Sequence, residues 1–107
     1  MHGYLWWYSH RYRDSDTAKQ IDNLLRARER YEGLCRRWKA RYPERVLVAW
    51  WLDMAEAGVS EETAWRVIAT SIGACEGIVL DIDGRPASDG MLRERGLASG
   101  LLVLELP

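Results

Sequence analysis

The sequence predicts an α/β fold: a doubly wound, three-layer sandwich with helices on both faces of a four-stranded parallel sheet. Short apolar runs typical of strands alternate with longer segments in which apolar residues recur every three or four positions. The resulting order, β-α-β-α-β-α-β, is typical of parallel sheets with right-handed crossovers. In a flavodoxin/Rossmann-like sheet of strand order 2-1-3-4, ligands bind outside the carboxyl ends of strands one and three.

The four predicted strands are short runs of aromatic, β-branched and leucine residues. They cover residues 3–8, 46–50, 78–82 and 101–106. The third run is apolar apart from one aspartate, as expected for a strand buried on both faces. It ends at two turn dipeptides, Asp83-Gly84 and Arg85-Pro86.

Three helices are predicted between these strands. The first covers residues 16–40, with Asp16 as its N-cap. We expect one buried stripe along it, formed by Ala18, Ile21, Leu24, Leu25, Tyr31, Leu34, Cys35 and Trp38. The second helix begins at Ser60, and residues 52–60 before it are expected to be irregular or a short helical turn. The third follows the third strand.

Length and composition indicate one domain covering residues 1–107. The formal net charge is −1, so there is no charge excess that favours nucleic acid or a membrane surface as a partner. No apolar run approaches the length of a membrane span, and the N-terminus lacks a basic signal-peptide region, so we expect a cytoplasmic protein. Cys35 and Cys75 lack metal-type spacing and are expected to be free thiols, and we expect no metal or cofactor.

The loop and helix after the third strand form a candidate polar site. Ser88 or Asp89 is expected to cap this helix, whose free N–H groups attract anions. Gly90 would let the backbone approach a ligand closely. Glu94 lies about one and a half turns into the helix. Taken alone, Ser88 is equally well explained as a plain cap and Glu94 as a surface residue.

These residues also carry a family resemblance. The pattern Ser88-x-Gly90-x-x-x-Glu94 after a buried strand resembles the nucleoside 2-deoxyribosyltransferase-like superfamily, which includes deoxyribosyltransferases, nucleotide N-glycosidases and many short uncharacterised phage and bacterial proteins. The resemblance implies that Glu94 is a nucleophile at the anomeric carbon of a nucleoside or nucleotide. It also implies that Ser88 and the helix N-terminus hold a sugar hydroxyl or a 5′-phosphate.

The loop after the first strand supplies further candidates for substrate binding: Ser9, His10, Tyr12 and Arg13. Relatives in the superfamily often have a small-Gly-Pro-Tyr-Arg loop here. The Arg13 guanidinium offers a planar fork of donors to a phosphate, and the Tyr12 ring offers a face to a base. Each of these residues is equally well explained as an ordinary loop residue.

Three more candidates lie at strand ends. Asp81 and Asp83 end the third strand and are candidates to bind a ribose hydroxyl, or to protonate the leaving base as a general acid. The presence of Asp83 is equally well explained by a structural role in the Asp83-Gly84 turn. Trp51 follows the second strand, where its ring could stack on a base.

Two hypotheses follow, an N-glycosidase or deoxyribosyltransferase and a non-catalytic nucleotide-binding module. Catalytic relatives usually carry an acidic residue within the helix before the third strand, whereas residues 65–69 have none and Glu61 lies at the helix start, too far away. This departure keeps the non-catalytic hypothesis open, together with a weaker one of a purely structural protein. The six Trp and five Tyr residues further suggest a homodimer or larger homo-oligomer, with contacts near Trp50-Trp51 or Tyr42.

Overall fold

The computed structural model describes residues 3–9 and 12–107 and has one four-stranded parallel sheet with the strand order β2-β1-β3-β4. The predicted fold class and strand order are therefore confirmed. Along the chain the elements are β1 (Tyr4–Tyr8), α1 (Thr17–Arg41), β2 (Val46–Val48), α2 (Trp50–Glu56), α3 (Glu61–Ala74), β3 (Gly77–Asp81), α4 (Asp89–Leu97) and β4 (Leu102–Leu106).

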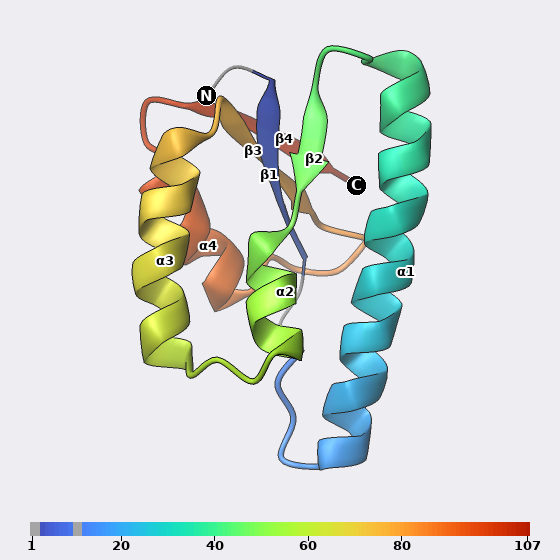
Figure 1. The fold of residues 1–107 in the computed structure, drawn as a ribbon, viewed down its shortest axis with the longest axis vertical. Coiled ribbons are helices and arrows are strands. Elements are labelled where there is room, and N and C mark those ends of the chain that lie inside the picture. The colour runs from blue at the N-terminus through green and yellow to red at the C-terminus, as the bar shows by residue number, and fades with distance from the viewer. Residues whose placement is uncertain (1–2, 10–11) are drawn as a thin grey trace.

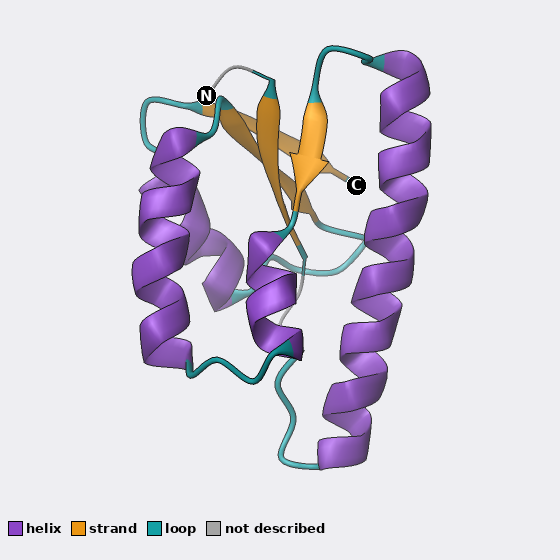
Figure 2. Cartoon of the chain, in the orientation of Figure 1, coloured by secondary structure: helices purple, strands orange, loops and turns teal. Residues whose placement is uncertain are grey.

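The helices form two unequal layers. Figure 1 shows α1 on one side of the sheet and α3 and α4 on the other, with α2 beginning at the lower end of β2. Figure 2 shows that the loops leaving the strands at this lower end lead into the helices. Below, this end of the sheet is called the carboxyl edge. Among the described residues, no helix has the length and apolar character needed to cross a membrane.

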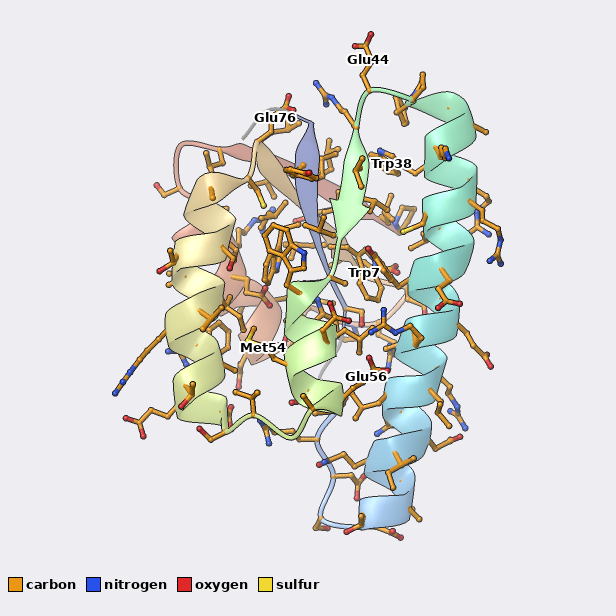
Figure 3. All side chains as sticks on the ribbon, in the orientation of Figure 1. Trp7, Trp38, Glu44, Met54, Glu56 and Glu76 are labelled. Carbon is orange, nitrogen blue, oxygen red and sulfur yellow. The ribbon has the colours of Figure 1, made fainter. Side chains whose placement is uncertain are left out.

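The core is built on the two central strands. Leu5, Trp6 and Trp7 of β1 lie beside Gly77, Ile78 and Val79 of β3 in register. All three β1 residues are fully buried, because helices cover both faces of this strand. Successive side chains point to opposite faces, so Trp6 faces α4 and Trp7 faces α1 (Figure 3 shows Trp7 on the α1 side).

The second crossover differs from the prediction. Residues 50–56 form a regular helix, α2, so the described chain has four helices rather than three and β2 ends at Val48. The cause is tertiary packing: Trp51 and Leu52 are buried against the core, and the Trp51 Nε1 donates a hydrogen bond to the Trp7 carbonyl at 2.6 Å. This contact fixes the start of α2 against the end of β1.

The predicted buried stripe of α1 is partly correct: Leu24 and the predicted residues of the second half pack against the core, whereas three residues of the first half do not. Ile21 and Leu25 are 54% and 56% exposed, and Ala18 is exposed as well. The 25 residues of α1 span about 37 Å, whereas a five-residue strand spans about 17 Å. The first half of α1 therefore extends past the carboxyl edge, where there is no sheet to bury its apolar side chains (Figure 1).

An ion pair between the partly exposed Arg30 and the buried Asp81 attaches the second half of α1 to the sheet. Asp81, at the end of β3, is fully buried and accepts hydrogen bonds from the Trp7 Nε1 at 3.2 Å and from Arg30 through Nε and, at 2.7 Å, Nη2. Both carboxylate oxygens are thus satisfied. Removing one partner of such a pair is strongly destabilising, because it leaves a buried charge without compensation.

We expect Arg30→Met to lower the free energy of unfolding by about 3 kcal/mol, because Asp81 would keep a buried charge with only the Trp7 donor left. Urea denaturation measures the loss. Arg28→Met is the matched control, because the Arg28 side chain also extends from α1 to pair with carboxylates, those of Asp53 and Glu56. Both of these carboxylates are exposed, so Arg28→Met should lower the free energy of unfolding by less than about 1 kcal/mol. Equal losses in the two variants would contradict this account.

Candidate functional site

A cavity of about 360 Å³ opens at the carboxyl edge, between the end of β1 and helices α2, α3 and α4. Four rings form its walls, those of Tyr8, Tyr12, Trp51 and Trp65. Tyr8 packs on Trp51 with ring centroids 4.8 Å apart, and Tyr12 stacks on the same indole at 6.2 Å. We call this the aromatic cavity; its walls suit a flat, partly apolar ligand.

Charged groups of both signs also line the aromatic cavity. The Arg93 guanidinium carbon lies 3.8 Å from the centroid of the Trp65 ring, a cation–π contact. The Arg13 Nε lies 3.5 Å from a carboxylate oxygen of Glu61, across the cavity wall. The cavity therefore offers hydrogen-bond donors and an acceptor beside its aromatic walls.

The N-terminus of α4 contributes the remaining polar groups. The Ser88 Oγ accepts a hydrogen bond from the Met91 N–H at 3.3 Å, which confirms Ser88 as the N-cap. A Cβ at Gly90 would lie 2.7 Å from the Tyr8 hydroxyl oxygen. The missing side chain at Gly90 thus makes room for the phenol of Tyr8, a close approach within the protein itself.

Glu94 lies behind the cavity, in the core. It is 0% exposed and is not among the cavity-lining residues, although Ser88, Gly90 and Arg93 of the same segment are. Its Oε1 accepts a hydrogen bond from the Trp6 Nε1 at 2.6 Å, and its Oε2 has no partner among the described residues. Burial raises the pKa of Glu94 well above its usual range, and the Trp6 hydrogen bond lowers it only in part.

Asp81 and Asp83 lie on the other face of the sheet. The Asp81 carboxylate is enclosed by Trp7 and Arg30, as described above. Asp83 is exposed and adopts a left-handed backbone conformation, with φ at 52°. Its carboxylate lies 3.6 Å from the Arg30 Nη2, on the α1 side, so the sheet separates Asp83 from Glu94. The two residues predicted to act together in catalysis are not brought together.

The predicted site residues thus fall into separate groups. The aromatic cavity contains Tyr12, Arg13, Trp51, Ser88 and Gly90. Ser9 and Asp83 line a second hollow on the α1 side, which Tyr12 also borders. His10 lies outside the described residues.

The cavity residues missed by the sequence analysis include Glu61, Trp65 and Arg93. Glu61 appeared too far away at the helix start, but α3 runs back along the sheet and begins at the carboxyl edge, so its first turn reaches the cavity. Crossover helices between parallel strands generally begin at the carboxyl edge of the sheet, and this rule would have placed Glu61 near the site. No sequence motif singles out Trp65 or Arg93 as a site residue.

No protein-family model matches the chain, and comparisons with curated proteins and with solved structures find no significant similarity. Within residues 3–9 and 12–107, no group of three or more His, Cys, Asp or Glu side chains is arranged to hold a metal ion.

The burial of Glu94 predicts a specific pH dependence of stability. Its folded-state pKa is raised above the unfolded value, so the folded state binds more protons and its stability falls as pH rises from the unfolded pKa towards the folded one. Glu94→Gln keeps the shape and can still accept from Trp6, but it cannot ionise. We expect wild type to lose stability relative to this variant as pH rises from 5 to 8, by up to about 1.4 kcal/mol per pH unit.

Urea denaturation of both proteins at a series of pH values measures the difference. Parallel stability curves for wild type and Glu94→Gln would show that Glu94 ionises normally in the folded protein.

Proposed function

We propose that the protein binds a nucleoside or nucleotide in the aromatic cavity and holds it without cleaving it, as a sensor or sequestering module. The observation that carries this proposal is the composition of the cavity: aromatic walls, two arginines and a capped helix N-terminus around about 360 Å³. A planar base stacks on indole and phenol faces, and a phosphate or sugar hydroxyl is bound by guanidinium and backbone N–H groups.

The position of Glu94 favours binding over cleavage. A nucleophile must touch the anomeric carbon, but the Glu94 carboxyl group is fully buried beside Trp6. Its raised pKa also favours the neutral carboxylic acid, which is a poor nucleophile. A ligand in the aromatic cavity would meet Tyr8 and the first turn of α4 instead.

We also propose that the chain is a distant relative of the nucleoside 2-deoxyribosyltransferase-like superfamily. Support comes from the parallel sheet of order β2-β1-β3-β4 and from the Ser88 cap at the carboxyl edge after β3. The homo-oligomer predicted from the aromatic content stays a prediction. Because Trp51 is 3% exposed and belongs to the core, only Trp50 and Tyr42 remain available for the expected contact.

Trp65→Leu tests ligand binding in the aromatic cavity. The ligands are first found by a thermal-shift screen of nucleosides and mononucleotides, since binding to the native state raises Tm. Titration calorimetry should then show at least about a tenfold weaker affinity for Trp65→Leu, because base stacking contributes about 1–3 kcal/mol.

The matched control is Trp38→Leu, which removes a half-buried indole of α1 that packs against Tyr42, away from the cavity. The proposal fails if the two variants bind equally well, or if no nucleoside or nucleotide shifts Tm.

Cleavage of the base–sugar bond is the second candidate function. One observation favours it: a carboxyl oxygen of Glu94 has no partner in the described part of the chain, and Glu94 lies on the helix whose first turn lines the cavity. Buried groups with a shifted pKa are common in active sites. In its neutral form Glu94 is suited to protonate a leaving base, and in its ionised form to attack the anomeric carbon; either step requires α4 or Tyr8 to move.

If this second function is correct, Glu94→Gln should slow base release by about 10²–10⁴-fold while ligand affinity is kept. Chromatography of the released base, with each ligand found in the screen, measures the rate. Under the binding proposal wild type releases no base at all. An active wild type whose rate is matched by Glu94→Gln would exclude Glu94 as the catalytic group.

A further inference from the structure

A second hollow, of about 320 Å³, lies between α1 and the loop after β3, on the face of the sheet opposite the aromatic cavity. Three arginines line it, Arg26, Arg30 and Arg85, against a single carboxylate, that of Asp83. We call it the arginine hollow, and we infer that it binds the phosphate group of a small molecule. This site is separate from the proposed nucleoside site.

Arg30 forms the fixed part of the arginine hollow. Its Nε and Nη2 hold the fully buried Asp81, which sets the plane of the guanidinium. The Nη1 makes no hydrogen bond to any of the described residues. A guanidinium held by a buried partner keeps little rotamer freedom, so little entropy is lost when its free donors bind an anion.

Arg26 and Arg85 form the adjustable part. Arg26 pairs with Asp22 one turn earlier on α1, and both side chains are largely exposed. Arg85 lies 3.9 Å from Asp83, at the limit of an ion pair. Exposed pairs of this kind contribute at most about 1 kcal/mol, so either arginine can exchange its partner for a phosphate, with which it forms two parallel hydrogen bonds.

Asp83 occupies the position that an anion would take. Its carboxylate lies between two arginines, 3.6 Å from Arg30 and 3.9 Å from Arg85, too far for a hydrogen bond to either. A phosphate carries more charge and more acceptor oxygens than this carboxylate, so it would outcompete Asp83 for both guanidinium groups. Asp83 therefore acts as an internal competitor that weakens phosphate binding.

Calorimetric titration with inorganic phosphate, and with ribose 5-phosphate against ribose, tests the site. We expect wild type to bind both phosphates and not ribose, with affinity that falls as salt is added. Arg26→Gln combined with Arg85→Gln should weaken phosphate binding at least about tenfold, since each loses a charge-assisted hydrogen bond. Arg66→Gln is the matched control, because Arg66 pairs with Glu62 in the same exposed i,i+4 manner on α3.

Asp83→Asn is expected to increase phosphate affinity, a result that misfolding of the variant cannot produce. Asparagine tolerates the left-handed φ of 52° and removes the competing charge, so phosphate affinity should rise several-fold. The inference is overturned if wild type binds no phosphate, if the double variant binds as well as Arg66→Gln, or if Asp83→Asn binds no more tightly than wild type.

The two proposed sites can fail independently. Trp65→Leu should leave inorganic phosphate binding unchanged, and the arginine variants should leave binding of an unphosphorylated nucleoside unchanged. Loss of both ligands in Arg26→Gln with Arg85→Gln would contradict a separate site.

Discussion

The structure depends on two neighbouring tryptophans in the central strand, each of which donates its indole N–H to a buried carboxyl group on a different face of the sheet. Trp6 donates to Glu94 of α4, and Trp7 donates to Asp81 at the end of β3. Because successive side chains of a strand point to opposite faces of the sheet, Trp6 and Trp7 must find their partners on different faces. The same dipeptide thereby contacts both helical layers, and each indole finds the partner that a buried N–H requires.

The two carboxyl groups are stabilised in opposite ways. Asp81 is fully buried and has Arg30 as a cation partner. Glu94 has no cation partner among the described residues, and burial favours its neutral form. This difference separates the two sides of the carboxyl edge: the α1 side is organised by charge, and the side of α2, α3 and α4 by aromatic packing. Ligands of different chemistry suit the two sides.

Much of this arrangement was predictable from the sequence, because the strand runs and caps are local signals. Strand order, the Asp16 and Ser60 caps and the Ser88 cap all agree with the structure. The sequence could not show that Glu94 turns into the core. A glutamate flanked by arginines has the pattern of a surface residue, and only the distant Trp6 supplies its partner. The spacing of apolar residues along α1 likewise does not show where the sheet beneath the helix ends.

The extension of α1 past the sheet gives the two proposed ligand sites different rigidity. The aromatic cavity is walled by elements packed on the sheet, whereas Arg26 belongs to the half of α1 that extends beyond it, where Ile21 and Leu25 face solvent. Helical turns with few buried contacts open locally at a lower free energy than the whole domain. An anion bridging Arg26 to the loop after β3 would suppress that opening. Anion binding in the arginine hollow would therefore slow amide hydrogen exchange in the first turns of α1. This effect would come from reduced local opening of the helix and not from a change in its average structure.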